Sequence, residues 1–249
     1  FGQKGWKAHL VCHCLLVETD RGLVLIDTGL GTQDYLHTQQ RLGSLLTKFG
    51  AIVPDIHLSA FHQIQRLGYS LDDVKHIFVS HIDFDHAGGI SDFPNATVHV
   101  LASEFNATQS LSLKGKNRYK TEQFKYHRYW NFAEQADGEA WFNLQKVKGL
   151  PLFQDEILMV PLVGHTLGHS AIAVKKQDGW ILFCGDAYFS HLELNPKNKL
   201  RALDFTERLL AEDNQQRLHN LKQLQYLAQH EPSIELICAH DPVEFNRYQ

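Results

Sequence analysis

The sequence predicts an α/β fold in which sheets pack between layers of helices. Short apolar, β-rich runs occur in both halves of the chain, and helical stretches follow them in each half. The chain has 249 residues, 43% of them hydrophobic and 21% charged, which is the balance of an ordinary globular protein. It contains no Pro/Gly/Ser-rich linker and no repeat of short period. We therefore predict a single domain over residues 1–249.

In the first half of the chain, two strands are expected as a hairpin and two more as single runs. The apolar, β-rich runs are residues 10–18, 23–27, 77–79 and 98–101. Between the hairpin and the third run, Leu, Ile and Phe recur at helical spacing, which predicts surface helices. Ser70 is the expected N-cap of a short helix because Asp72 and Asp73 follow it. A further helix is expected from Ser103.

In the second half, strands and helices follow a segment without a clear pattern. Residues 114–141 have no regular period, which predicts a long loop or an irregular insertion. Strands are expected at residues 157–162, 171–175, 180–183 and 234–238. Residues 204–230 carry the apolar pattern of one amphipathic helix or of two abutting ones.

Composition excludes several classes of protein. The 24 basic and 28 acidic residues give a net charge of −4, so the basic footprint of a nucleic-acid-binding protein is missing. The four cysteines form no Cys-x-x-Cys pair and are too few for a secreted disulfide scaffold, which predicts reduced thiols and a cytoplasmic protein. No apolar run is long enough to span a membrane. The chain begins with Phe1 rather than methionine, which leaves open a preceding strand or targeting segment.

The strongest local motif is His-x-Asp-x-Asp-His, which directly follows a predicted buried strand. Its chemical residues are His81, Asp83, Asp85 and His86. They lie on a turn, where side chains can converge instead of alternating across a sheet. The glycines at positions 88 and 89 are expected to let the backbone turn tightly beside a charged centre. The alternative, a solvated acidic loop, is weaker because four such residues are grouped so closely.

Three other predicted strands also end at histidine or aspartate. The segment Gly-His-Thr-x-Gly-His carries His165 and His169, Cys-Gly-Asp carries Asp186, and Ala-His-Asp carries His240. Rigid strands that aim such side chains from the loops at their ends are typical of metal sites. Because a chain of this length buries enough surface to fold without a metal staple, a bound metal is expected to serve chemistry.

These motifs resemble those of the metallo-β-lactamase-fold hydrolase superfamily, from Asp27-Thr28-Gly29 to Ala239-His240-Asp241. Their order and spacing are nearest to the branch of N-acyl homoserine lactonases and pyridoxolactonase. The resemblance implies a four-layer αββα sandwich with a dinuclear metal site, commonly of zinc. It also implies the ligands, with His81 and His165 on the first metal, Asp85, His86 and His240 on the second, and Asp186 bridging both.

The sequence departs from the family pattern at Asp83. The usual loop is His-x-His-x-Asp-His, and Asp83 stands where the second histidine is expected. If Asp83 binds the first metal, its harder carboxylate oxygen accommodates manganese or iron as well as zinc. The charges of Asp83, Asp85, Asp186 and one hydroxide then offset two divalent ions. The alternative is that Asp83 only orients a water or another ligand and leaves the first site weak, and we favour ligation.

Asp85 and Tyr188 are the candidate catalytic residues. Two metals lower the pKa of a bridging water, so that hydroxide is available at neutral pH, and they polarise the scissile carbonyl or phosphoryl oxygen. Asp85 is expected to accept the proton and pass it to the leaving group. Tyr188 is a candidate donor to the substrate oxygen, although lactonases carry their tyrosine at a different offset, and a core tyrosine is the alternative. His169 and Asp27 are expected to support the site loops.

Basic and aromatic side chains alternate at the start of the patternless segment. The basic residues are Lys114, Lys116, Arg118, Lys120, Lys125 and Arg128. Such a segment can bind a nucleic-acid strand, form a lid over a small anionic or acyl substrate, or simply be solvated. Because the protein is net acidic, we favour a lid or a solvated segment and expect no nucleic-acid partner.

The sequence therefore predicts a metal-dependent hydrolase that uses a metal-bound hydroxide on a small ester or lactone carbonyl. Its expected partner is a small-molecule substrate, with no membrane, and its oligomeric state is not indicated. The enzyme alternatives are a glyoxalase II-like thioesterase and a phosphodiesterase. The non-enzyme alternative is a metal-binding protein with decayed activity, which Asp83 alone suggests.

Overall fold

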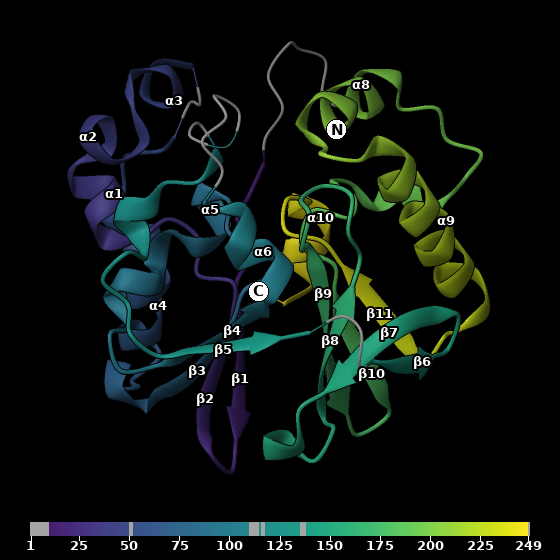
Figure 1. Ribbon diagram of the computed structural model, residues 1–249, viewed down its shortest axis with the longest axis horizontal. Coiled ribbons are helices and arrows are strands. Elements are labelled where there is room, and N and C mark those ends of the chain that lie inside the picture. Colours follow the sequence, from purple (N-terminus) through teal and green to yellow (C-terminus); the bar gives the residue numbers. More distant parts are fainter. Residues whose placement is uncertain (1–9, 50–51, 110–114, 116–117, 135–137, 249) are drawn as a thin grey trace. The chain divides into compact units, whose positions relative to one another are not determined.

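The computed structural model describes residues 10–49, 52–109, 115, 118–134 and 138–248. The chain divides into two compact units, one formed by Cys14–Phe132 and the other by Phe1–His13 with Ala133–Gln249. Each unit contains one mixed β-sheet with helices beside it (Figure 1). The single domain expected over residues 1–249 stays a prediction.

The unit Cys14–Phe132 holds a five-stranded sheet in the order β1-β2-β3-β4-β5. β1 pairs with β2 as an antiparallel hairpin, whereas β2, β3 and β4 run parallel. The strands are β1 (Leu15–Thr19), β2 (Gly22–Ile26), β3 (Val74–Phe78), β4 (Thr97–Leu101) and β5 (Trp130–Ala133). The helices are α1 (Thr32–Leu36), α2 (Thr38–Leu42), α3 (Ser44–Phe49), α4 (Ala60–Arg66), α5 (Phe84–Ala87) and α6 (Ala102–Ala107). Short 3-10 turns are η1 (Ile56–Leu58), η2 (Leu71–Asp73), η3 (Gly88–Asp92) and η4 (Thr121–Gln123).

The core of this unit forms between its sheet and its helices. α4 begins at its N-cap Ser59, whose hydroxyl accepts the backbone N–H of His62, and it buries Ala60 and Ile64 in the same cluster as strand residues such as Ile77. β2 is apolar on both faces, as expected of a strand covered by helices, whereas β3 carries Lys75 and His76 before the buried Ile77 and Phe78. This packing fixes the carboxyl end of β3, from which the first candidate site loop leaves.

The second unit holds a six-stranded sheet in the order β11-β10-β9-β8-β7-β6. β10 and β11 are parallel, and the other neighbouring pairs are antiparallel. The strands are β6 (Glu139–Trp141), β7 (Leu144–Gly149), β8 (Ile157–Pro161), β9 (Ser170–Lys176), β10 (Gly179–Phe183) and β11 (Ile234–Ile237). The helices are α8 (Arg201–Leu210), α9 (Asn214–His230) and α10 (Pro242–Phe245), with 3-10 turns η6 (Pro151–Phe153), η7 (His191–Leu194) and η8 (Asn246–Tyr248).

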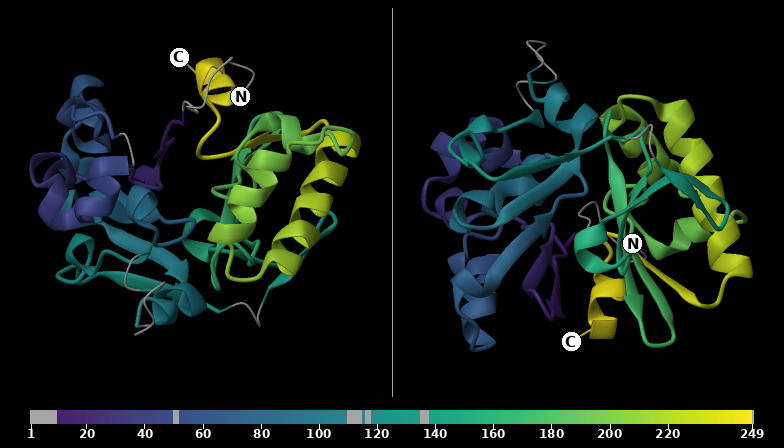
Figure 2. Two further views of the ribbon diagram at one scale, coloured as in Figure 1. Left: turned by 90° about the horizontal axis from the view of Figure 1, so that it is seen from above. Right: turned by 60° about the horizontal axis from the view of Figure 1, so that its bottom comes forward.

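The long helix α9 covers one face of the six-stranded sheet. Leu224 and Leu227 are fully buried and share a core cluster with strand residues such as Leu182. Figure 2 shows α8 and α9 side by side on this unit. They are separate helices because Asp213 caps α9, its carboxylate accepting the backbone N–H of Gln216 at 3.0 Å. The expectation of one or two helices over residues 204–230 is resolved as two.

Most predicted strands are confirmed, but the interpretation of residues 114–141 as wholly irregular is wrong. That range contains β5 and β6, and β7 follows it unpredicted. β5 and β6 are edge strands of their sheets and bury little apolar surface, so their sequences lack strand periodicity. Lys114 and Lys116 lie outside the described residues.

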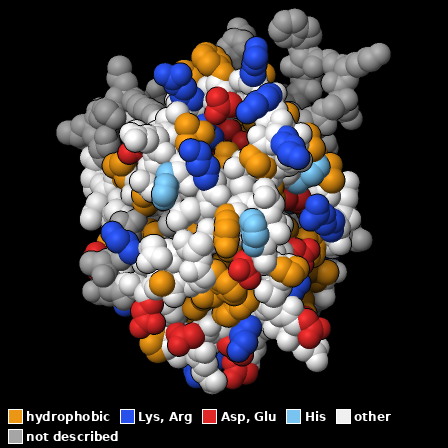
Figure 3. Space-filling view, turned by 90° about the vertical axis from the view of Figure 1, so that its right-hand side faces the viewer, with side chains coloured by type: hydrophobic (Ala, Val, Ile, Leu, Met, Phe, Trp, Pro, Cys, Tyr) orange, Lys and Arg blue, Asp and Glu red, His pale blue; other side chains and the backbone are white. Residues whose placement is uncertain are grey.

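The surface mixes charges of both signs. Figure 3 shows basic, acidic and hydrophobic side chains interspersed on the side of the molecule seen from the right of Figure 1. Among the described residues, no helix is long and apolar enough to cross a membrane.

Candidate metal centre

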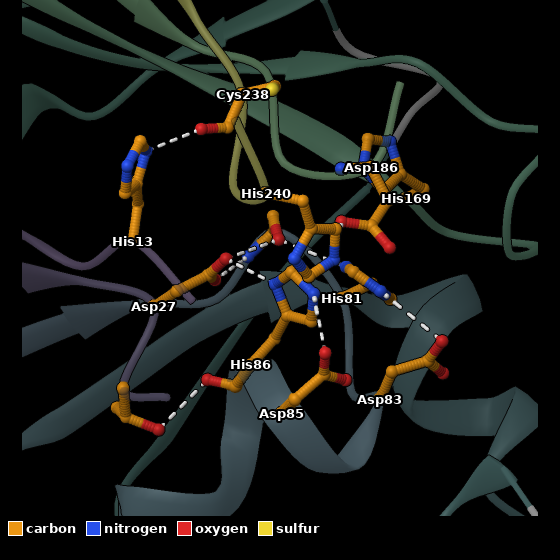
Figure 4. A network of polar contacts seen from close by, with 12 residues as sticks. His13, Asp27, His81, Asp83, Asp85, His86, His169, Asp186, Cys238 and His240 are labelled. Atoms are coloured by element: carbon orange, nitrogen blue, oxygen red, sulfur yellow. Dashed lines mark hydrogen bonds and ion pairs between the residues drawn. The ribbon is translucent and has the colours of Figure 1, made fainter. Parts of the chain in front are cut away.

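The predicted metal ligands fall into two clusters, one in each compact unit, and each is described by itself. His81, Asp83, Asp85 and His86 lie in the unit Cys14–Phe132. His165, Asp186 and His240 lie in the other unit. Figure 4 shows side chains of both sets.

In the first cluster, the chain passes from β3 into the short helix α5. His81 is fully buried just beyond the strand. Asp83 is the N-cap of α5, but its side chain makes no capping bond, so the carboxylate is directed elsewhere. Asp85 and His86 lie within the helix, and the rings of His81 and His86 have centroids only 4.0 Å apart. The loop therefore brings its four predicted ligands together, as the spacing indicated.

Asp27 orients both imidazoles of this cluster. Its carboxylate accepts a hydrogen bond from His86 Nδ1 at 2.7 Å (Figure 4). It also accepts the Ser80 hydroxyl at 2.7 Å, and Ser80 Oγ lies 3.0 Å from His81 Nδ1. Because the serine proton is given to Asp27, Ser80 Oγ is left to accept the proton of His81 Nδ1. Both rings then present an unprotonated Nε2, the atom that binds a metal.

The two carboxylates of the loop have different surroundings. Asp83 Oδ2 lies 3.4 Å from His81 Nε2 and 3.5 Å from Nη1 of the buried Arg118. Asp85 Oδ2 lies 3.9 Å from His86 Nε2, and this side chain is one-fifth exposed, at 19%. Asp83 is therefore held by a cation, whereas Asp85 is partly open to solvent.

The paired glycines after the loop allow close packing rather than a special backbone conformation. A Cβ on Gly88 would lie 2.7 Å from the Gly29 carbonyl oxygen, and a Cβ on Gly89 would lie 2.9 Å from that of Thr28. Gly88 itself has φ of −58°, which any residue adopts. The expectation of a tight turn is corrected to a close approach of the Asp27-Thr28-Gly29 backbone.

In the second cluster, Asp186 lies between two histidines of its own unit. One carboxylate oxygen, Oδ2, is 3.4 Å from His165 Nε2, and the other, Oδ1, is 3.0 Å from His240 Nε2. All three side chains are buried. Each oxygen of one carboxylate therefore faces a different imidazole, which is the arrangement of a bridging ligand.

Neighbouring backbone groups hold this second cluster in place. His240 Nδ1 lies 2.8 Å from the Val11 carbonyl oxygen, so Nδ1 carries a proton, and in the neutral ring Nε2 holds the lone pair. His169 Nδ1 donates to the Leu162 carbonyl, and its Nε2 accepts the backbone N–H of Asp186, each at 3.0 Å. Both ring nitrogens of His169 are thus used in tying the β8 end to Asp186, as expected for a supporting residue.

The donor chemistry of both clusters fits divalent metal ions. Lone-pair nitrogens of His81 and His240 face carboxylate oxygens at 3.4 Å and 3.0 Å. Two acceptors at such distances repel one another unless a cation or a proton lies with them. The combination of imidazole and carboxylate suits zinc, manganese or iron. These residues would hold the metals.

Tyr188 lies in the hydrophobic core cluster of its unit. Its side chain is fully buried, and its hydroxyl lies 3.1 Å and 3.3 Å from the two Glu244 carboxylate oxygens. Burial in this apolar cluster raises the pKa of the Tyr188 hydroxyl well above its ordinary value. This placement favours the core alternative, and a catalytic role for Tyr188 stays a prediction.

Several residues that support the two clusters were not found from the sequence. Glu104 of α6 is fully buried and accepts the backbone N–H of Ile82 at 3.0 Å. Phe189 lies against His240 and His165, with ring centroids 4.9 Å and 6.2 Å away. Neither Glu104 nor Phe189 belongs to a sequence motif. Phe189 could have been indicated only by its position three residues after Asp186, and nothing in the sequence indicates Glu104.

His13 is a further supporting residue, and no motif in the sequence contains it. Its backbone N–H donates to the Ala239 carbonyl at 2.9 Å, and its Nδ1 to that of Cys238 at 2.6 Å. Burial lowers the pKa of His13 to about 4. This neutral histidine therefore fixes the end of β11 directly before His240.

Comparison with known proteins shows the family of this chain. The chain belongs to the metallo-β-lactamase superfamily, whose family model matches residues 9–229. A probable metallo-hydrolase of Mycobacterium tuberculosis is 39% identical over 239 residues, covering 94% of this chain and 75% of the relative. An N-acyl homoserine lactonase of Bacillus thuringiensis is 28% identical over 189 residues, covering 75% of this chain and 67% of the relative.

A solved structure shares the fold. It is that of an N-acyl homoserine lactone hydrolase with the product N-hexanoyl-L-homoserine bound at its catalytic metal centre, with a TM-score of 0.70 and 24% identity. The match covers 96% of this chain and 84% of that one. The predicted α/β metallo-β-lactamase fold is therefore confirmed, with two mixed sheets and helices. The chain is a metallo-hydrolase of this superfamily, as predicted.

Proposed function

We propose that this protein hydrolyses a lactone or a small ester with the help of two divalent metal ions. The observation that carries the proposal is the position of Asp186, whose two oxygens face His165 and His240 separately. A carboxylate placed in this way suits two ions rather than one.

The ligand assignment extends the same proposal to both clusters. His81, His165 and Asp83 are assigned to the first ion, and Asp85, His86 and His240 to the second, with Asp186 shared. Support comes from the ring orientations, because Asp27 and the Val11 carbonyl hold the Nδ1 protons of His86 and His240. Zinc is the expected metal, and the oxygen of Asp83 also suits manganese or iron.

The metals, when bound, supply a strongly acidified water and polarise the scissile carbonyl. Asp85 is the residue proposed to hold the proton of that water on a carboxylate oxygen and to pass it to the leaving alcohol. Its partial exposure and its place on the first turn of α5 support this role. Asp83, whose side chain is 13% exposed, is less suited, because Arg118 and His81 already contact its Oδ2.

The choice of a lactone is supported by the relatives. Proteins named N-acyl homoserine lactonases match three quarters of the chain at 28% identity. A chain with the same fold binds the opened lactone product at its metal centre. We therefore propose a small lactone as the substrate class.

The test is hydrolysis by protein of known metal content. The purified chain is reconstituted with zinc, manganese or iron, its metal is quantified, and lactones, a glutathione thioester and bis(p-nitrophenyl) phosphate are offered. We expect two ions per chain and turnover of lactones. Asp186→Asn should lower turnover at least about a hundredfold, whereas Asp178→Asn, in an exposed turn, should not.

Each contrary result has a definite meaning. Turnover of only the thioester or only the phosphodiester would replace the lactone with that substrate class. Two bound metals without any hydrolysis would favour a metal-binding protein with decayed activity. A reconstituted chain that retains no metal would overturn the proposal altogether.

A further inference from the structure

Arg118 belongs to the basic and aromatic segment that the proposed chemistry leaves unexplained. It is 9% exposed, and its Nη1 lies 3.5 Å from Asp83 Oδ2. Asp83 is the position at which the loop departs from the pattern of its family. Two features that looked separate in the sequence therefore meet in one ion pair.

The segment that carries Arg118 is attached to the loop and to the core. Tyr119 and Phe124 are buried in the hydrophobic cluster of the same unit. Gln123 is fully buried, and its amide donates to the Phe84 carbonyl at 2.9 Å and to Asp34 at 2.8 Å. The segment thus contacts the loop at two successive residues, Asp83 through Arg118 and Phe84 through Gln123. Arg118 is therefore held beside Asp83 by packed neighbours and not only by its charge.

Burial makes the pair strongly interdependent. A guanidinium stays protonated at all ordinary pH values, so a buried arginine requires a nearby anion. If Asp83, whose side chain is 13% exposed, is neutralised, the buried guanidinium of Arg118 loses the carboxylate that it contacts. The positive charge of Arg118 also cancels the negative charge of Asp83. Together the two residues therefore add no net charge beside the metals. In this respect the pair is equivalent to a neutral histidine at position 83.

We infer that Arg118 is a positioning residue for Asp83. Its guanidinium holds the carboxylate next to His81 and cancels the charge that aspartate adds to the ligand set. The metal part of this inference rests on the proposed function, whereas the pairing itself does not. Arg118 is not assigned any contact with substrate.

The first test uses metal-free protein and measures thermal unfolding. Asp83→Asn should lower the melting temperature by about 6 °C or more, because the buried Arg118 loses its contact with the Asp83 carboxylate. Adding Arg118→Gln to that variant should recover at least half of the loss. If the double variant melts lower by the sum of the two single effects, the pairing is refuted.

The second test measures zinc affinity by competition with a chromophoric chelator. With Arg118 present, Asp83→Asn should weaken binding by about a hundredfold, because ligand and charge balance are both lost. In the Arg118→Gln background the same change should cost about tenfold or less. Arg118→Lys keeps the charge and should stay within about threefold of the parent protein. An equal cost of Asp83→Asn in both backgrounds would overturn the inference.

A matched control separates this effect from the charge of the whole segment. Arg128 lies in the same segment but is exposed, so Arg128→Gln should leave melting temperature and zinc affinity unchanged. If Arg128→Gln weakens zinc as much as Arg118→Gln does, the segment acts only through its long-range field and the inference fails. A parent protein that binds no zinc would refute the proposed function, while the thermal test would still decide the pairing.

Discussion

Asp27 supports the first cluster through direct contacts with its neighbours. The residue is fully buried and has φ of 52°, in the left-handed region that an aspartate tolerates better than most residues. In this conformation its carboxylate accepts hydrogen bonds from Ser80 and from His86. The backbone N–H and the hydroxyl of Thr28 both donate to the His86 carbonyl. One strained turn therefore fixes both the ring and the backbone of His86.

Replacing Asp27 with asparagine should weaken metal binding without removing any proposed ligand. We expect Asp27→Asn to reduce zinc affinity by about 10- to 100-fold, because the His86 ring loses its charged acceptor. Chelator competition measures the affinity, and circular dichroism checks that the variant is folded. Asp20→Asn, in the exposed turn of the hairpin, serves as the control. A folded Asp27→Asn protein with parental affinity would contradict the orienting role.

Tyr188 offers a second test at the scale of one residue. Since its hydroxyl bonds to the buried Glu244, Tyr188→Phe should lower the free energy of unfolding by about 1–3 kcal/mol. Turnover should fall less than about threefold, because no reacting group is lost. Urea unfolding and steady-state kinetics measure the two effects. A large loss of kcat with unchanged stability would instead establish the catalytic role that the sequence left open.

At the scale of elements, the strand ends were predictable and the supports between them were not. Apolar strands followed by His or Asp are visible in the sequence, so β3, β8, β10 and β11 and the residues after them were found. Arg118 and Glu104 could not be assigned, because their partners lie 35 and 22 positions away, and an isolated charge has no pattern. The edge strands β5 and β6 were missed because they bury too little to show periodicity.

The loop after β8 contains a glycine at a position where any side chain would be strained. Gly164 has φ of +140°, and a Cβ there would lie 2.4 Å from the backbone nitrogen of Arg217. The same loop bonds to the α8–α9 connection, where the Glu212 backbone N–H donates to the His165 carbonyl at 3.0 Å. The close approach of α9 therefore positions His165.

Gly164→Ala should destabilise the protein by more than the backbone strain of an alanine at positive φ. A left-handed alanine costs about 1–2 kcal/mol, and the contact with Arg217 adds to this. Gly68→Ala is the matched control, since Gly68 has φ of +90° but a Cβ there would have nothing within 4 Å. Urea unfolding should show the larger loss for Gly164→Ala, accompanied by weaker zinc binding. Equal losses in the two variants would mean that the contact with α9 does not matter.

At the scale of the whole molecule, buried titratable groups limit stability on both sides of neutral pH. Burial lowers the pKa of His13 to about 4 and that of His99 to about 3. The unfolded chain therefore binds protons that the folded chain does not, and stability is lost as the pH falls below about 6.5. On the alkaline side, burial and the neighbouring Glu193 carboxylate raise the pKa of Glu207 to about 9. Glu207 shares Arg217 with the exposed Asp204, so one guanidinium contacts two carboxyl groups.

Glu207 should make the protein less stable as the pH rises. The unfolded glutamate loses its proton near pH 4.5, whereas the folded one keeps it to about pH 9. Between these values the folded state holds the extra proton, and its advantage falls by about 1.4 kcal/mol per pH unit for one full proton. Urea unfolding at pH 7, 8 and 9, with a metal chelator present throughout, should show this decline. Glu207→Gln should flatten this decline of stability with pH, whereas the control Glu134→Gln, at an exposed position, should leave it unchanged. If the Glu207→Gln curve runs parallel to that of the parent protein, the Glu207 carboxyl is already ionised at pH 7.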